Sequence, residues 1–315
     1  MLGLILKRLL VAIPLLFVMS FLVFSLVAFV PGDPAVTLAG GDAASPATVE
    51  QIRQELNLDE PFLVQYGDWL AGAVHFDFGN SLYTQQPVAE ELARRLPVTM
   101  SLAIAVFILV IPLAVIVGVI GGLRPNAFLD RVLQFLTSLA VSMPPFWVAL
   151  VLISIFAVNL GALPPYGYSP FTDGAGAWLQ TIILPAIAIA LACVAVLSRQ
   201  VRAGLADTMQ SSFIRTAWAK GGSTRQVVMG HALKNSAIPA VTVMGLQIGS
   251  ILGGTVIIEQ IFSIPGIGSY MLEAVTNKDV AVIQAVAILF VMANVIANLG
   301  VDITYGYLNP KVRAS

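Results

Sequence analysis

The chain has 315 residues, of which 58% are hydrophobic and only 10% are charged. Soluble domains contain about 25% charged residues, so the composition excludes an ordinary soluble domain and indicates a protein surrounded by lipid. The 16 basic residues nearly cancel the 17 acidic ones, so net charge gives no sign of a nucleic-acid partner, and none is expected.

Six stretches are apolar and long enough to cross a bilayer, since a transmembrane helix needs about 20 mostly apolar residues. They are residues 9–30, 99–123, 133–158, 179–197, 237–258 and 280–301. Lys7 and Arg8 precede the first stretch, as in a signal peptide, but its apolar run exceeds the roughly 7 to 15 residues of a signal core. We therefore expect a retained span and an all-α polytopic membrane protein.

Orientation follows from the bias of Lys and Arg toward cytoplasmic loops. With the N-terminus inside, the inner segments hold most of the basic residues and the outer segments hold most of the acidic ones. The inner basic residues are Lys7, Arg8, Arg124, Arg131, Arg199, Arg202, Arg215, Lys220, Arg225, Lys234, Lys311 and Arg313. The reverse topology would place most of this charge outside, so both termini are expected in the cytoplasm.

A long polar segment, 31–97, follows the first span and is expected outside the membrane. Pro46 directly after Ser45 favours a helix start at that point. After Pro61, apolar residues recur at the spacing of an amphipathic helix. Two interpretations of this helical extracytoplasmic segment stay open: a structural cap over the outer mouth, and a docking surface or gate.

The inner segment 199–236 is basic, with Asp207 as its single acidic residue. Its sequence predicts an amphipathic helix from about Ala206 to Lys220, ended by the glycines that follow. The residues on or beside its apolar face are Ala206, Met209, Phe213, Ile214, Ala217 and Trp218. Such a helix suits insertion into a groove on a soluble partner, and a helix lying on the lipid surface is the alternative.

Signs of catalytic chemistry are missing from the sequence. No G-x-x-x-x-G-K-[ST] phosphate loop occurs, so the chain is not expected to hydrolyse ATP by that device. His75 and His231 fall on opposite sides of the membrane in this topology, so no metal site is expected, and Cys193 is the single cysteine. The spans hold almost no ionisable residues, which argues against a stand-alone ion-coupled transporter or channel.

Three glycines, Gly245, Gly249 and Gly253, recur at four-residue intervals in the fifth predicted span. Small residues at this spacing let two helices approach closely. Tight packing is one interpretation, and a moving helix at a pore or subunit seam is the other.

Motifs along nearly the whole chain resemble the permeases of ATP-binding cassette (ABC) importers, in the dipeptide and oligopeptide branch. In the inner segment, Arg215-Thr216-Ala217 and then Gly221 resemble the EAA loop of that family, with Arg215 where the general family has glutamate. The other motifs are Pro31-Gly32-Asp33-Pro34; Asp77-Phe78-Gly79-Asn80-Ser81; Arg95-Leu96-Pro97 with Thr99; His231-Ala232-Leu233 with Asn235; Glu259 with Phe262, Pro265, Gly266 and Gly268; and Asp302, Tyr305, Leu308, Pro310 and Arg313. Their order and spacing together make the resemblance specific.

The resemblance implies a type I ABC importer permease fold with six transmembrane helices in the bacterial inner membrane. It implies three parts: 1–97, the first span with the extracytoplasmic segment; 98–308, the core with the loop 199–236; and 309–315, a cytoplasmic tail. The residues expected to couple to an ATPase are Phe213, Arg215, Thr216, Ala217, Trp218, Lys220 and Gly221. The residues expected to form an extracytoplasmic loop motif are Glu259, Phe262, Pro265, Gly266 and Gly268.

The implied partners, besides membrane lipid, are a second related permease, two ATPase subunits that hold ATP and Mg, and an extracytoplasmic solute-binding protein. No cofactor is expected in this chain itself. The implied cargo is a short peptide. Nickel chelates, glutathione and some glycans travel through similar permeases, and the sequence does not separate these cargoes.

Overall fold

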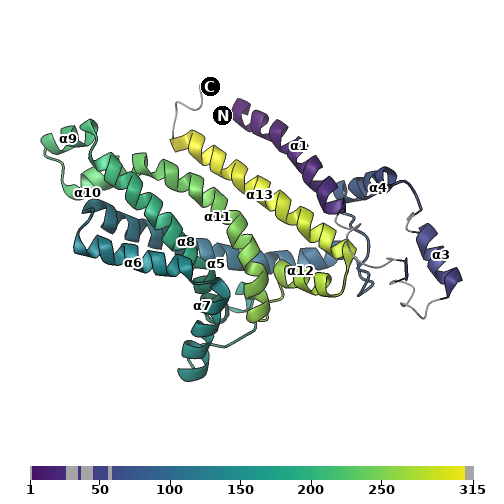
Figure 1. Cartoon of the computed structure of the whole chain (residues 1–315). Helices are drawn as coiled ribbons and strands as arrows, with labels where there is room; N and C mark the ends of the chain where they lie inside the picture. Colours follow the sequence, from purple (N-terminus) through teal and green to yellow (C-terminus); the bar gives the residue numbers. More distant parts are fainter. Residues whose placement is uncertain (1, 26–34, 37–44, 56–58, 309–315) are drawn as a thin grey trace. The chain divides into compact units, whose positions relative to one another are not determined.

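The computed structural model describes residues 2–25, 35–36, 45–55 and 59–308, and it is helical nearly throughout this part of the chain (Figure 1). The Pro31–Pro34 motif and the tail 309–315 lie outside the described residues. The fold consists of two compact units. Unit 1 contains Thr99–Ile264 and the last turns of the final helix, and unit 2 contains the described parts of Leu9–Val98 together with Pro265–Val295.

Unit 2 is built from helices at both ends of the chain. Its elements are most of α1 (Leu2–Ser25), α3 (Pro46–Glu55), α4 (Phe62–Val74), the first turns of α5 (Val88–Leu123), α12 (Ile267–Thr276) and the first half of α13 (Val280–Leu308). The backbone N–H of Thr48 donates to Ser45 Oγ at 3.1 Å, which caps α3 and confirms the helix start predicted from Ser45 and Pro46. The helix predicted after Pro61 is confirmed as α4.

Two apolar clusters hold unit 2 together. The rings of α1 and α4 pack edge to face, and the hydroxyls of Ser20 and Tyr66 are 2.8 Å apart, so these two helices are joined by both apolar and polar contacts. The second cluster joins the start of α5 to α12 and α13. Its fully buried members are Val88, Ile267, Val282, Ala285 and Val286.

Unit 1 is organised around one long helix, α8 (Ala175–Met209). This helix packs against α6 (Phe128–Ser142), α7 (Pro145–Leu152) and α11 (Leu233–Ile261). The remaining short elements are a π-helical turn (Ile153–Asn159), a 3₁₀ turn (Phe171–Asp173), α9 (Ser212–Ala219), α10 (Thr224–Val227) and a second π-helical turn (Val228–Ala232). About half of the residues of α8 from Ile182 to Leu205 are buried, because neighbouring helices cover it on several sides.

The all-α polytopic membrane fold is confirmed. Among the described residues, four helices are long and apolar enough to span a membrane, in α5, α8, α11 and α13, or five if the bent pair α6–α7 is one span. The apolar part of α1 whose side chains are described, Leu10–Ser25, is shorter than this criterion requires. The count of six spans therefore stays a prediction.

The prediction of one continuous third span over 133–158 is wrong. The chain bends by 100° between α6 and the helix that begins at Pro145. Met143 and Pro144 both adopt extended conformations, with ψ of 121° and 138°. The ring of a proline disfavours the α conformation of the residue before it, so two prolines in succession end one helix and start another.

The second span also differs from its prediction. Helix α5 begins at Val88 rather than at Thr99, so Pro97 lies inside a helix instead of before one. The step from unit 2 to unit 1 nevertheless falls between Val98 and Thr99. The predicted functional division at 97/98 stays a prediction, since by packing unit 2 also includes Pro265–Val295.

Candidate functional site

The inner segment forms a short helix held between two turns. Helix α8 continues to Met209, the chain turns at Gln210 and Ser211, and α9 then runs to Ala219, so the single helix predicted from about Ala206 to Lys220 is wrong. Ser211 is extended, with ψ of 153°, which breaks the helical path. The first and last parts of the predicted loop 199–236 lie within α8 and α11.

The glycines after α9 end it, as predicted. Gly221 has φ of 80°, a left-handed conformation that glycine adopts without steric cost. Its N–H donates to the carbonyl of Trp218 at 2.9 Å, and the N–H of Gly222 donates to that of Ala217 at 3.3 Å. Gly221 therefore turns the chain sharply away from α9 while satisfying the last carbonyls of the helix.

One side chain of α9 packs into the core of unit 1. Ile214 is fully buried in an apolar cluster with Leu205 of α8, Val227 of α10 and Ala232. Ser223 and Gln226 form a capping box that starts α10 directly after the turn. Helix α9 thus packs on its unit through Ile214 and is followed directly by α10.

The exposed side of α9 is aromatic and basic. Phe213 is 45% exposed and Trp218 is 39% exposed, while Arg215, Thr216 and Lys220 are exposed as well. The sequence pattern placed Phe213 on the apolar face of the predicted helix and Ile214 beside it, and in the structure Ile214 is buried within the unit while Phe213 is exposed. The reason is that α8 ends before α9 begins, so the two helices do not share one continuous face. Ala217 is half-buried.

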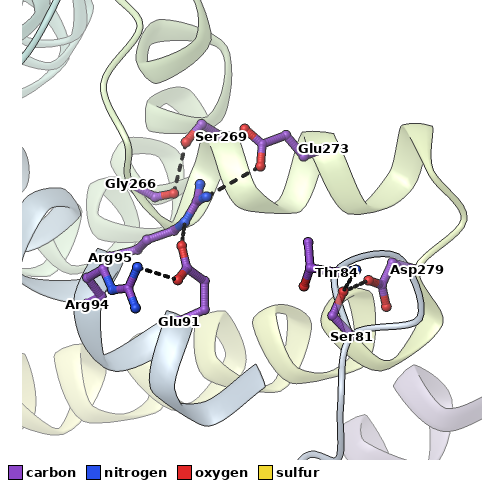
Figure 2. Close-up of polar contacts among 9 residues, drawn as sticks. All are labelled: Ser81, Thr84, Glu91, Arg94, Arg95, Gly266, Ser269, Glu273 and Asp279. Atoms are coloured by element: carbon purple, nitrogen blue, oxygen red, sulfur yellow. Dashed lines mark hydrogen bonds and ion pairs between the residues drawn. The ribbon is translucent and has the colours of Figure 1, made fainter. Parts of the chain in front are cut away.

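A second candidate region lies in unit 2, where Arg95 is enclosed by partners from α5 and α12 (Figure 2). Its Nε donates to Glu91 Oε1 at 2.6 Å, and its Nη2 lies 3.5 Å from Glu273 Oε2. The guanidinium is 4.6 Å from the centre of the Tyr270 ring. Burial, and then the nearby carboxylates, raise the pKa of Tyr270 to about 12, so this ring stays neutral at physiological pH.

The Asp77–Ser81 motif is anchored to the start of α13 (Figure 2). Ser81 Oγ donates to Asp279 Oδ2 at 2.5 Å, and Ser81 Oγ in turn accepts from the backbone N–H of Thr84 at 2.9 Å. Asp279 is 2% exposed, and its other oxygen accepts from the backbone N–H of Val282 at 3.4 Å. The Asp77–Ser81 motif therefore contacts a buried carboxylate that lies 198 residues after Ser81 in the sequence.

The predicted loop motif from Glu259 to Gly268 is divided between the two units. In unit 1, Glu259 is fully buried and accepts from Thr99 Oγ1 at 2.7 Å, and the carbonyl of Phe262 accepts from the N–H of Gly167 at 2.8 Å. In unit 2, Pro265 is exposed, Gly268 is buried, and Gly266 caps α12 through a carbonyl that accepts from Ser269 Oγ at 2.9 Å.

The three glycines of α11 differ in their surroundings. A Cβ on Gly245 would lie 2.8 Å from Val301 Cγ2, so α11 and α13 approach closely there. A Cβ on Gly253 would meet nothing within 4 Å, and Gly249 is half-buried. The prediction that this spacing serves packing or a pore stays a prediction.

The sequence reasoning missed Asp130, in the first turn of α6. This residue is 1% exposed, and Arg202 of α8 donates to it through Nε at 2.5 Å and through Nη2 at 2.7 Å. The signal that was available is a single acid between Arg124 and Arg131, in the predicted inner segment that follows the second span. Within residues 2–25, 45–55 and 59–308, no group of His, Cys, Asp and Glu is arranged to hold a metal.

The sequence matches two family models. One, described as "Binding-protein-dependent transport system inner membrane component", matches residues 111–314. The other, described as "Binding-prot-dependent transport system membrane comp, N-term", matches residues 1–103.

Similar proteins include a peptide transport system permease of Brucella abortus (strain 2308), 42% identical over 313 residues, which are 99% of each chain. The glutathione transport system permease of Escherichia coli (strain K12) is 39% identical over 313 residues, again 99% of each chain. These matches and the apolar helices fit a multi-pass permease component, not a catalytic subunit. The chain belongs to the family of binding-protein-dependent transport system inner membrane components, the permease subunits of ABC importers.

Proposed function

We propose that this chain forms half of the path by which an ABC importer carries short peptides across the bacterial inner membrane. A second related permease supplies the other half, and an extracytoplasmic binding protein delivers the peptide. Two ATPase subunits, which hold ATP and Mg, drive the cycle from the cytoplasm, where both termini of this chain lie. The relative from Brucella abortus, named for peptide transport and matched over nearly its whole length, supports this cargo.

The observation that carries the proposed mechanism is the construction of α9. Ile214 fixes this helix to its own unit, which leaves Phe213 and Trp218 exposed beside Arg215 and Lys220. Exposed aromatic residues next to basic ones are typical of a surface that binds a partner. We assign this surface to a groove on the ATPase subunit, because an apolar helix face can fill such a groove.

Deleting the gene tests the cargo. A strain that needs an amino acid and lacks this chain should not grow when a di- or oligopeptide is the only source of that amino acid. Growth on the free amino acid should persist, and a plasmid copy of the gene should restore growth on the peptide. Undiminished growth of the deletion strain on peptides, with other peptide importers removed, would contradict peptide transport.

Glutathione is the second candidate cargo, and the Escherichia coli relative named for glutathione transport favours it. The same deletion strain should then lose growth on glutathione as the sulfur source while it keeps growth on ordinary peptides. Loss of both would indicate one path that accepts several peptide-like solutes.

A further inference from the structure

The pair formed by Asp130 and Arg202 joins α6 to α8 by two parallel hydrogen bonds. The carboxylate also accepts from the backbone N–H of Asn126 at 2.8 Å and from Gln134 Nε2 at 3.0 Å, so its oxygens are well supplied with donors. Removing one member of such a buried pair leaves an uncompensated charge, which is strongly unfavourable. The register between α6 and α8 is therefore fixed at this point.

Helix α5 packs closely against α6 and α8 at two of its glycines. A Cβ on Gly121 would lie 2.9 Å from Asp130 Oδ1, and a Cβ on Gly118 would lie 2.7 Å from the carbonyl oxygen of Ser198 on α8. Helix α5 therefore comes within contact distance of the Asp130 carboxylate and of the α8 backbone. Three helices of unit 1 thus meet at one ion pair.

The ion pair lies close in sequence to a residue of the apolar cluster that buries Ile214 of α9. Leu205, three residues after Arg202 on α8, belongs to the apolar cluster that buries Ile214 of α9. Between them, a Cβ on Gly204 would be 2.8 Å from the carbonyl oxygen of Ser236 on α11. Leu205 therefore gives α9 a direct packing contact with the segment of α8 that carries Arg202.

We propose that Asp130 is a positioning residue for transport: its bidentate bond to Arg202 makes α6 and α8 move as one piece when α9 is displaced. The assignment rests on the proposed function, in which the ATPase displaces α9. A charge-assisted bidentate pair suits this task, because it is roughly twice as strong as a neutral hydrogen bond and has a fixed geometry. Without it, α8 can shift while α6 stays behind.

The test uses the complete transport complex, purified through this chain and reconstituted in liposomes. Asp130→Asn with Arg202→Gln replaces the ion pair by a neutral hydrogen-bonded pair of similar size. We expect this double variant to assemble with the ATPase and to hydrolyse ATP, but to take up about tenfold less labelled peptide per ATP hydrolysed. Arg202→Lys keeps the positive charge but cannot form two parallel hydrogen bonds to the carboxylate. Its ratio of peptide uptake to ATP hydrolysis should therefore lie between those of the wild type and the double variant.

Arg199→Gln is the matched control, because Arg199 lies about one turn earlier on α8 and lines a small cavity together with Asp130 and Arg202. Its Nε donates to the carbonyl of Ala195 instead of to Asp130. Its ratio of uptake to hydrolysis should equal that of the wild type. A wild-type ratio in the double variant, or an equal fall in Arg199→Gln, would overturn the inference. If the double variant does not assemble, a wild-type ratio in Arg202→Lys would overturn it.

The wild-type complex separates this inference from the proposed function. If the wild-type complex takes up no peptide, the proposed peptide import is wrong and the positioning role falls with it. If the wild type transports peptide and the variants keep its ratio, only the role of Asp130 is wrong. The midpoint temperature of unfolding of each variant separates two explanations. If only the joint movement of α6 and α8 is lost, the midpoint stays near that of the wild type, whereas a destabilised fold lowers it.

Discussion

At the scale of single residues, Gly221 is a position at which the backbone conformation itself favours glycine. Its φ is 80° and a Cβ there would meet nothing within 4 Å, so a substitution acts only through the backbone. An L-residue in this conformation costs about 1–2 kcal/mol. We expect Gly221→Ala to lower the amount of ATPase that copurifies with the chain, or to give hydrolysis without uptake, and Gly221→Val to do so more strongly.

Gly230→Ala is the control for this prediction. Gly230 also has open space around its would-be Cβ, but its φ is not in the left-handed region. Both substitutions add one methyl group and only one adds backbone strain. Equal ATPase binding and uptake by the two variants would show that the conformation of Gly221 does not matter.

The buried carboxylate of Asp279 supports a second prediction at this scale. Ser81→Ala removes a hydrogen bond to a charged group, which costs roughly 1.5–3 kcal/mol, and Asp279→Asn weakens the same contact. Each variant should unfold at a lower temperature, as followed by tryptophan fluorescence in detergent. Because the two share one interaction, the double variant should lose less than the sum of the single losses.

Thr84→Ala serves as the control for unit 2. Thr84 is exposed, and it donates to Ser81 Oγ through its backbone N–H, which the substitution keeps. Its unfolding temperature should match that of the wild type. Strictly additive losses in Ser81→Ala and Asp279→Asn would show that the two side chains act independently.

At the scale of elements, α9 presents two neighbouring apolar residues with opposite surroundings. Ile214→Asp buries an unpaired charge in the cluster around Leu205 and should unfold the inner segment or prevent expression. Phe213→Asp changes an exposed side chain, so the chain should fold at the wild-type temperature and fail to retain the ATPase. Affinity purification followed by a count of bound ATPase subunits measures the difference.

The result that would contradict this prediction is normal ATPase retention by Phe213→Asp at normal expression. Helix α9 would then be a surface element without a partner on its aromatic side. Ser212→Ala, on the same helix but outside the residues expected to couple to the ATPase, is a mild control, since Ser212 is exposed and accepts from Thr216 through its backbone carbonyl, which the substitution keeps. It should retain the ATPase.

The helices that the sequence predicted best are those that need only length and an apolar composition. The cores of α8, α11 and α13 were found for this reason, although α8 runs to Met209, 12 residues beyond its predicted end at 197, and α13 runs to Leu308, 7 residues beyond 301. The bend at Met143 and Pro144 was missed, because hydropathy does not register a conformation imposed by two prolines. Glycine at 221 was predicted correctly, because a helix end has a local signature.

The polar contacts could not be predicted from the sequence, because they join residues far apart in the chain. Ser81 with Asp279, and Asp130 with Arg202, lie 198 and 72 residues apart. No local pattern specifies which acid meets which donor. The buried face of α9 was likewise missed, since the position of Leu205 and Val227 around Ile214 depends on how the neighbouring helices end.

At the scale of the whole molecule, two long helices each contain residues of both units. Helix α5 changes unit between Val98 and Thr99, and α13 changes unit between Val295 and Ile296. Polar contacts flank the first of these points within each unit: Arg95 is bound in unit 2, and Thr99 is bound to Glu259 in unit 1. Each of these two helices therefore contributes residues to both units.

The last prediction concerns the orientation of the whole chain in the membrane. Basic residues favour the cytoplasmic side, so Glu60 is expected outside and Lys220 inside. Both side chains are exposed, and Cys193 is the single cysteine of the sequence. In a Cys193→Ala background, a maleimide can therefore label only the new cysteine introduced at either position. A membrane-impermeant maleimide should label Glu60→Cys in cells with only the outer membrane opened, and Lys220→Cys after the inner membrane is opened as well. Labelling of Glu60→Cys only after the inner membrane is opened would reverse the topology and would remove α9 from the side on which ATP is available.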